Sequence, residues 1–186
     1  MKKKWEYIAP DKELTEKISN EFGISKLIAG ILVSRGIIDF DKIKIFLDPT
    51  RNDFYDPFLM PDMEVAVDRI IKAIDNKEKV IIYGDYDADG VTSSAVLSAA
   101  LEQFGCAEVE IILPDRFKDG YGLNLPAVPK IVEGGAKLVI TVDCGSGSGE
   151  VIDELSMQSV DCIVTDHHEI PNIPSGAVAV INPKRA

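Results

Sequence analysis

The residues best suited to chemistry in this sequence are carboxylates that directly follow a short apolar segment. Asp85, Asp87 and Asp89 come after the apolar run 80–83, two residues apart from one another, and Gly90 closes the group. Carboxylates packed this closely, with no basic residue among them, repel one another unless a cation lies between them. We therefore expect the group to bind a divalent metal ion.

Two further apolar segments end in residues that could bind the same metal. Asp143 follows one of them, and Asp166, His167 and His168 follow another, so both histidines of the chain lie in one motif. Carboxylates with one or two imidazoles suit Mn²⁺, Mg²⁺ or Zn²⁺, and the excess of carboxylates favours the harder ions. Asp166 is suited to fix the tautomer of a neighbouring ligand histidine.

The spacing of residues 85–90 also matches the opening of an EF-hand calcium loop. An EF-hand closes its loop with a glutamate, and the corresponding position here is Val96. An EF-hand also begins after a helix, whereas the run 80–83 indicates a strand. We therefore reject the calcium-loop interpretation and expect Gly90 to let the chain turn.

Weaker signals could bind the phosphate, base or sugar of a substrate. Arg116 could reach a phosphate and Tyr121 could stack on a base or sugar, although a surface arginine and a plain turn explain them equally well. Thr92 and Ser93 are predicted to open a helix whose free N–H groups could receive a phosphate. The glycine-rich segment at Gly145 could offer backbone amides to the same group, but it lacks the lysine of a nucleotide-binding P-loop.

The predicted strands and helices explain how these residues could meet. Apolar runs and helical periods alternate along the second part of the chain, with strands at 79–84, 108–113, 137–142, 160–165 and 177–181 and helices at 91–105, about 125–134 and 148–157. This alternation predicts an α/β fold of three layers built on a mostly parallel sheet. In such a sheet, ligands collect beyond the carboxyl ends of the strands, near a switch in strand order. The three motifs should therefore converge.

The first 61 residues are predicted to form a small helical region and a connector. Ser25 is expected to cap the second of three short helices, and Asp39 or Asp41 the third. The inward faces are predicted from apolar residues at helical spacing, namely Leu14, Ile18 and Phe22, then Leu27, Ile28, Ile31 and Leu32, then Ile43, Phe46 and Leu47. We therefore divide the chain into an arm over 1–61 and an α/β domain over 62–186, whose first helix Asp62 would cap.

Composition and charge argue against several classes of protein. The chain has 186 residues, is 46% hydrophobic and carries a formal net charge of −11, which argues against a protein that coats nucleic acid in general. Its longest apolar runs are far shorter than the roughly 20 residues of a membrane span. Three cysteines without a CxxC pair predict no disulfide framework and favour a reducing cytoplasm.

These motifs resemble those of a known family, the DHH phosphoesterases. Residues 84–93, 142–145 and 166–168 are similar to the first three motifs of that family. Further likenesses point to its RecJ branch, the single-strand-specific 5′→3′ exonucleases, and lie at 114–117, 120–124, 181–185, Trp5 and the connector 56–63. The resemblance covers essentially the whole chain.

The resemblance implies a phosphoesterase with two metal ions, usually Mn²⁺ or Mg²⁺. Carried over by position, Asp87 would hold one ion and Asp143 would bridge it to the other. Asp89 and His167 would complete the second metal site. Two ions a few ångströms apart stabilise both the attacking and the leaving oxygen of a phosphodiester.

The resemblance also implies a reaction and partners. His168 would contact the scissile phosphate or help orient the attacking water, Asp166 would orient a histidine, and Asp85 would lie in or just outside the ligand shell. The enzyme would hydrolyse single-stranded DNA from its 5′ end, releasing 5′-mononucleotides in DNA repair and recombination. Single-stranded DNA, a single-strand-binding protein and a helicase are the expected partners.

Two departures from the family pattern leave alternatives open. Tyr83 stands where many relatives have a histidine, so the ion at Asp87 would bind more weakly or use Asp85 or water instead. The fourth motif and second domain of the family would follow Ala186, so we expect an amino-terminal piece that is deficient alone. The alternatives are a phosphodiesterase acting on oligoribonucleotides, cyclic dinucleotides or pyrophosphate, and a non-catalytic scaffold.

Overall fold

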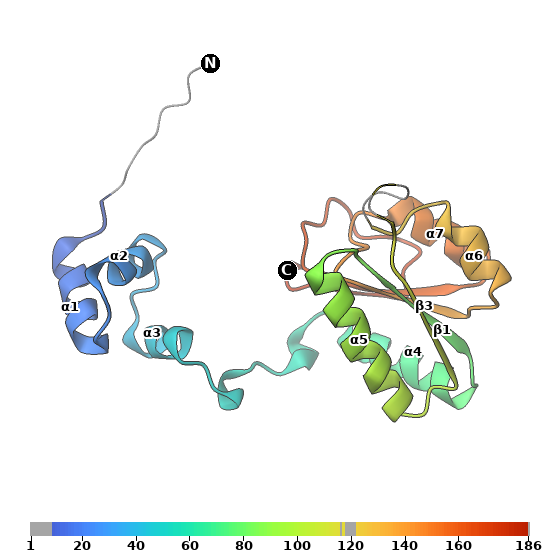
Figure 1. The fold of residues 1–186 in the computed structure, drawn as a ribbon, viewed down its shortest axis with the longest axis horizontal. Helices are drawn as coiled ribbons and strands as arrows, with labels where there is room; N and C mark the ends of the chain where they lie inside the picture. The colour runs from blue at the N-terminus through green and yellow to red at the C-terminus, as the bar shows by residue number, and fades with distance from the viewer. Residues whose placement is uncertain (1–8, 116, 118–121, 186) are drawn as a thin grey trace, which may run out of the picture. The chain divides into compact units, whose positions relative to one another are not determined.

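The computed structural model describes residues 9–115, 117 and 122–185, and the chain divides into two compact units, Met1–Tyr55 and Asp56–Ala186 (Figure 1). The division therefore falls after residue 55, whereas the sequence placed it after residue 61. The short helix η2 (Pro57–Leu59) contacts helix α4 (Met63–Asp75), and Met60 packs against the core of the second unit. These contacts assign the end of the predicted connector to the second unit.

The first unit contains the three predicted helices, α1 (Lys12–Phe22), α2 (Lys26–Ser34) and α3 (Phe40–Leu47), followed by a short turn of 3₁₀ helix, η1 (Arg51–Asp53). Each α-helix begins at a side chain that accepts a hydrogen bond from an N–H of the first turn, which is otherwise unpaired. Ser25 caps α2, as predicted, and Asp39 rather than Asp41 caps α3. The starts of α2 and α3 can therefore be predicted from their capping residues.

The predicted inward face of α2 is wrong at three of its four residues and is confirmed at Leu32. Leu27 is 75% exposed, and Ile28 and Ile31 are about half exposed, whereas Ala29 and Leu32 are buried. A Cβ atom at Gly30 would lie 3.3 Å from Pro10, so the small residues of α2 face the preceding segment at close range. This close approach turns the larger residues outward. Phe46 and Leu47 of α3 are likewise exposed, and Ile43 alone of its predicted face is buried.

The second unit is an α/β domain, as predicted. Its five strands are all paired in parallel in the order β2-β1-β3-β4-β5. The strands are β1 (Lys79–Gly84), β2 (Glu108–Ile112), β3 (Leu138–Val142), β4 (Asp161–Thr165) and β5 (Ala179–Ile181). Each lies where its Val- and Ile-rich run predicted it, with small shifts at the ends, because strands covered on both faces read as continuous apolar runs.

Helices cover both faces of the sheet and complete the three layers (Figure 1). Side chains from alternate positions of β1 enter the two cores: Val80 and Ile82 pack with α4 and α5 (Ala88–Gln103), and Ile81 and Tyr83 pack with α6 (Ala127–Glu133) and α7 (Gly149–Met157). β2 and β3 flank β1 on opposite sides, so the strand order switches at β1. The carboxyl ends of β1 and β3 are therefore where a ligand is expected.

Two predictions about helix starts need correction. Helix α5 begins at Ala88, earlier than the predicted residue 91, because the Asp87 side chain caps it. Asp62 stands at the start of α4, but its side chain makes no capping hydrogen bond. It accepts hydrogen bonds from the Val180 N–H, at 3.1 Å, and from Arg185 instead. The Asp62 carboxylate therefore ties α4 to the edge strand β5.

Within the described part of the chain, none of the helices combines the length and the apolar composition that a bilayer crossing requires. Cys106, Cys144 and Cys162 are all buried and free.

Candidate metal centre

The loops that follow β1, β3 and β4 bring the three predicted motifs together. Ligand atoms of Asp85, Asp87 and Asp143 lie within 4.8 Å of one another, and so do ligand atoms of Asp143, His167 and His168. Two groups of three potential ligands therefore share one carboxylate, that of Asp143. Carboxylate and imidazole groups at this density are typical of sites for Mn²⁺, Mg²⁺ or Zn²⁺.

The end of β1 is shaped by a close approach between backbones. A Cβ atom at Gly90 would lie 2.3 Å from the carbonyl oxygen of Asp85, so only glycine lets the first turn of α5 pack there. Oδ1 of Asp87 accepts hydrogen bonds from the N–H groups of Asp89, at 2.9 Å, and Gly90, at 3.1 Å. The bond from Gly90 is the main reason why the pKa of Asp87 is lowered. Asp87 is therefore an ionised, fixed carboxylate.

Asp85 is the most deeply buried carboxylate of the centre. It is 2% exposed, and its Oδ1 has no hydrogen-bond partner among the residues that the structure describes. Burying a carboxylate oxygen without a donor costs free energy, and nearly all such atoms in proteins have a partner. Two further carboxylates lie close by and supply only acceptors. A metal cation would satisfy this oxygen, so the donor set fits a bound metal.

Asp143 follows β3 in an uncommon backbone conformation. Its φ is +61°, a left-handed value that few non-glycine residues adopt, and the nearby Gly145 has a φ of +106°. The hydroxyl of Thr141 donates to the carbonyl of Cys144 at 2.8 Å, and the Asp143 N–H donates to the carbonyl of Thr165 at 3.0 Å. These bonds hold the turn that directs the Asp143 carboxylate toward the other ligands.

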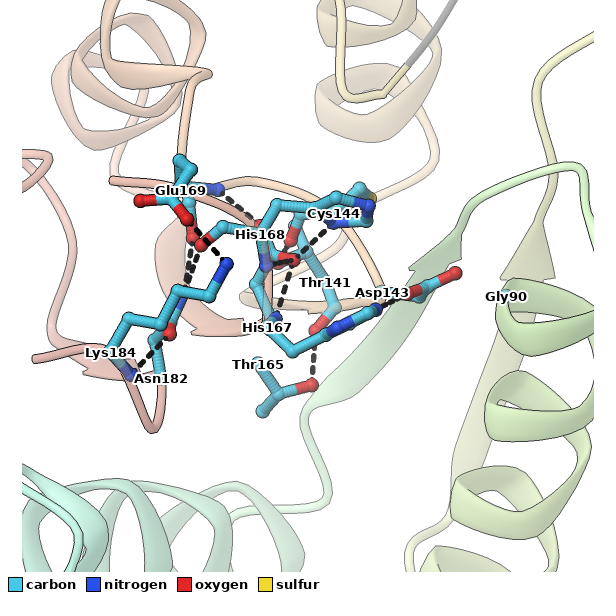
Figure 2. A network of polar contacts seen from close by, with 12 residues as sticks. Gly90, Thr141, Asp143, Cys144, Thr165, His167, His168, Glu169, Asn182 and Lys184 are labelled. Carbon is cyan, nitrogen blue, oxygen red and sulfur yellow. Dashed lines mark hydrogen bonds and ion pairs between the residues drawn. The ribbon is translucent and has the colours of Figure 1, made fainter. Parts of the chain in front are cut away.

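The charge state of Asp143 is coupled to its neighbours. Burial raises the pKa of Asp143, a hydrogen bond from His167 opposes this, and the charge of Asp87 adds to the rise. Nε2 of His167 lies 2.9 Å from Oδ1 of Asp143 (Figure 2). A contact of this length needs one proton between the two atoms, carried by Nε2 of His167 or by Oδ1 of Asp143. Divalent metal would compete with that proton for the same atoms.

Asp166 is buried and organises the loop after β4. Its Oδ1 accepts from the N–H groups of His167 and His168 and lies 2.8 Å from Nδ1 of His168, and its Oδ2 accepts from the N–H of Ser146. Burial alone would raise the pKa of Asp166, but the backbone hydrogen bonds from His168 and Ser146 lower it overall. An ionised Asp166 can only accept a hydrogen bond, so Nδ1 of His168 carries a proton in this contact.

A hollow of about 310 Å³ opens over the centre. It is lined by residues from all three motifs, namely Asp89, Ser93, Val142, Asp143, Thr165, Asp166 and His167. Asp89 thus borders the centre, although it belongs to neither group of ligands within 4.8 Å. Thr92 and Ser93 do not open α5 as predicted but lie inside it, and the Thr92 hydroxyl donates to the carbonyl of Ala88. Their role toward a substrate stays a prediction.

The remaining predicted residues either lie beside the metal centre or are not among the residues that the structure describes. Arg116 and Tyr121 are not among the described residues. Gly145 is buried in the turn after β3, and its role toward a phosphate stays a prediction. The hydroxyl of Tyr83 donates to the carbonyl of Gly122 at 3.3 Å, and the side-chain amide of Asn124 donates to that hydroxyl at 3.4 Å. These bonds connect β1 to the loop that precedes α6.

Sequence reasoning missed the polar residues that support the ligands. Thr141, Ser146 and Asn182 hydrogen-bond to the loops that carry Asp143, Asp166 or His168, and the Thr165 hydroxyl donates to the carbonyl of Thr141 in β3. Threonines inside apolar strands read as ordinary strand residues, and no local pattern marks them. Asn182 had one available signal, a polar residue directly after a buried strand, as in the three recognised motifs.

Comparisons with known proteins identify the family to which the chain belongs. The DHH family, N-terminal domain, matches residues 79–186, more than half of the chain. The single-stranded-DNA-specific exonuclease RecJ of Bacillus subtilis is 42% identical over 185 residues, which are 99% of this chain and 23% of that protein. RecJ of Haemophilus influenzae is 37% identical over 74% of this chain and 24% of its own length.

Solved structures give the same result. A crystal structure of exonuclease RecJ bound to manganese aligns with a TM-score of 0.64 and 32% identity, over 70% of this chain and 33% of that one. RecJ from Thermus thermophilus, in complex with Mn²⁺, aligns with a TM-score of 0.67 and 25% identity, over 95% of this chain and 24% of that one. The chain spans about a quarter of the length of the curated relatives it matches. It belongs to the DHH family.

Proposed function

We propose that this chain forms the metal-binding part of a 5′→3′ exonuclease that hydrolyses single-stranded DNA with two divalent metal ions. The observation that carries the proposal is the position of Asp143, whose carboxylate belongs to both groups of potential ligands. A shared carboxylate between two ligand groups is what a two-metal site needs, since the two ions of such sites lie roughly 4 Å apart.

The proposed ions are Mn²⁺ or Mg²⁺. The support comes from the chemistry of the donors, since carboxylates outnumber imidazoles and hard cations prefer oxygen ligands. The unpaired Oδ1 of buried Asp85 supports a cation at the same place, among the residues that the structure describes. Two similar proteins of known structure are described as manganese complexes. In the proposed arrangement Asp87 would hold one ion, Asp89 and His167 would hold the other, and the carboxylate of Asp143 would be available to both.

The proposed catalytic roles follow from how the side chains are held. Bound divalent ions would activate a water molecule and neutralise charge on the phosphoryl oxygens. Asp166 holds the Nδ1 proton of His168, so the ring can present Nε2 to the scissile phosphate or to the attacking water. The cap bonds at Asp87 fix its carboxylate before substrate arrives, which limits the reorganisation needed during the reaction.

The substrate and the biological setting are proposed from the relatives. Those named above are single-stranded-DNA-specific exonucleases, and we propose the same substrate here, with release of 5′-mononucleotides in DNA repair and recombination. A single-strand-binding protein and a helicase are the proposed partners, and the cytoplasm is the proposed compartment. Because the relatives are about four times as long as the matched segment, we propose that this segment alone is deficient in activity.

The test is a nuclease assay on the full-length protein. We expect Mn²⁺-dependent digestion of a 5′-phosphorylated single-stranded oligodeoxynucleotide, with mononucleotides as the product and little digestion of the same sequence as a duplex. Oligoribonucleotides, cyclic dinucleotides and pyrophosphate are assayed in parallel. A preference for any of these small substrates over long single-stranded DNA would contradict the exonuclease proposal, and the absence of any metal-dependent hydrolysis would favour a scaffold.

A further inference from the structure

The segment 182–185, which follows β5, belongs to a recognised stretch of the sequence that the proposed mechanism does not use. Within it, Asn182 has a completely buried side chain, with 0% exposure. A buried side-chain amide has two N–H donors and a carbonyl acceptor that must all be satisfied. The partners of these atoms therefore reveal what the residue holds in place.

Asn182 donates to two of the loops that border the candidate metal centre. Nδ2 donates to the hydroxyl oxygen of Ser146 at 3.0 Å and to the carbonyl oxygen of His168 at 3.0 Å. Its Oδ1 accepts from the N–H of Lys184 at 2.9 Å, which folds the following turn onto the same side chain. Figure 2 shows Asn182 beside His168, with Lys184 on the adjoining turn. One side chain thus joins the loops that follow β3, β4 and β5.

The contact with Ser146 continues to the carboxylate that orients His168. The N–H of Ser146 donates to Oδ2 of Asp166 at 2.9 Å. Ser146 thus contacts Asn182 through its hydroxyl oxygen and Asp166 through its main-chain N–H. Asp166 in turn lies 2.8 Å from Nδ1 of His168.

We propose that Asn182 is a positioning residue, which holds His168 from two sides. It binds the main-chain carbonyl of His168 directly, and through Ser146 it fixes the Asp166 carboxylate that orients the imidazole ring. This inference rests on the proposed function, in which His168 acts on the scissile phosphate or the attacking water. Other residues already attach β5 to the sheet: Val180 donates to Asp62, and residues 179–181 pair with β4. Asn182 is therefore not needed to hold that strand.

The test uses the full-length protein with Asn182→Asp, which keeps the shape of the side chain and the acceptor for Lys184. The aspartate cannot donate to the carbonyl of His168, and it places an acceptor against that oxygen. We expect kcat on single-stranded DNA to fall roughly 10- to 100-fold. This range is typical of substitutions at residues that orient active-site side chains by hydrogen bonding to them. KM should change by no more than about twofold, because the substrate contacts themselves are kept.

The matched control is Val180→Ala, which weakens the packing of the same strand and leaves the polar contacts intact. We expect this variant to unfold at a lower temperature but to keep the kcat of the wild type at temperatures where it is folded. Asn182→Asp should lose kcat even where circular dichroism shows it fully folded. An unchanged kcat in folded Asn182→Asp, or an equal loss of kcat in both variants, would overturn the inference.

A structural measurement separates this inference from the proposed function. If the wild-type protein does not hydrolyse single-stranded DNA, the proposed function fails, but the position of His168 can still be compared between crystal structures of the wild type and Asn182→Asp. We expect the contact between Nδ1 of His168 and Asp166 to be lost in the variant. A ring that keeps its wild-type position and contact would overturn the positioning role.

Discussion

Oδ1 of Asp143 lies 2.9 Å from Nε2 of His167, although the two residues follow different strands. Ligand atoms of the same carboxylate, of Asp85 and of Asp87 all lie within 4.8 Å of one another. Asp143 therefore links the acidic loop after β1 to the histidine loop after β4. Parallel pairing of β3 with both β1 and β4 makes this possible, because it brings all three loops to the same edge of the sheet.

Asp143→Asn should remove most of the metal-dependent activity. The amide keeps the size of the side chain but lacks the charge that would attract two divalent ions. Loss of a residue that only hydrogen-bonds to a metal ligand already lowers metal affinity or activity by roughly 10- to 100-fold. We therefore expect the loss of a ligand itself to lower the activity by at least about 100-fold. The measurements are nuclease activity and Mn²⁺ affinity by calorimetry. The control is Asp68→Asn, which removes the same single negative charge from an exposed residue of α4. This variant should behave as wild type.

Asp85→Asn should have opposite effects on stability and on metal binding. The buried Oδ1 has no hydrogen-bond partner among the described residues and lies near two other carboxylates. An amide removes the repulsion and can donate to its neighbours, so the metal-free variant should be more stable by about 1 kcal/mol. Mn²⁺ at 100 times its Kd would stabilise the wild type by about 2.7 kcal/mol, and the variant by much less.

Thermal unfolding with and without MnCl₂ checks both parts of the Asp85 prediction. We expect the two unfolding curves of the wild type to be well separated and those of the variant to be nearly superimposed. A metal-free variant that melts below the metal-free wild type would mean that the Asp85 carboxylate stabilises the fold by itself. The assignment of that residue to the metal would then be wrong.

Gly145→Ala should destabilise the turn that presents Asp143. A Cβ atom at this position would lie 2.5 Å from the hydroxyl oxygen of Thr141, and the φ of +106° is strained for any other residue. We expect a loss of roughly 1–3 kcal/mol in the free energy of unfolding. Chemical denaturation measures this quantity. Gly149→Ala is the matched control, because a Cβ there meets nothing within 4 Å, and it should be neutral or slightly stabilising.

Stability at low pH should depend on Asp62. The hydrogen bond from Arg185 lowers the pKa of Asp62 from its ordinary value of 3.8. A carboxyl group with a lowered pKa in the folded state contributes stability that is fully present above pH 3.8 and is lost as the pH falls through the folded value. After allowance for solvent screening, we expect the contribution to be roughly 1 kcal/mol.

Urea denaturation of the wild type and of Asp62→Asn measures this contribution. The difference in stability between them should be largest near neutral pH and should shrink as the pH falls below 3.8. A difference that stays constant over this range would show that the charge of Asp62 plays no part and that only its hydrogen bond to Val180 matters.

Sequence periodicity was sufficient to locate the strands and the three ligand motifs. The runs that became β1, β3 and β4 are mostly apolar, and each is followed by carboxylates or histidines, a local pattern that needs no knowledge of contacts. Parallel strands point the same way, so residues after their carboxyl ends must lie at one edge. The meeting of Asp85, Asp143 and His167 could therefore be predicted from the order of elements alone.

The start of α5 can be predicted from the sequence when both roles of Asp87 are considered. Aspartate is a metal ligand and also a preferred N-cap residue, and the Asp87 carboxylate accepts from the N–H of Gly90. The helix consequently begins at Ala88, and Thr92 and Ser93 lie within it. A residue with two local roles is ambiguous in sequence, because each role alone accounts for its presence.

Tertiary structure alone decided the contacts between residues that are distant in sequence. The Asp62 carboxylate, expected to cap α4, instead binds Val180, 118 positions away, and Asn182 reaches Ser146, 36 positions away. Whether a short polar side chain bonds to its own turn or to another strand depends on which partner packing brings within about 3 Å. The sequence by itself determined which residues could bind metal and at which edge they would meet. The fold determined which side chains hold them there, because those hydrogen bonds exist only once the sheet and its loops are packed.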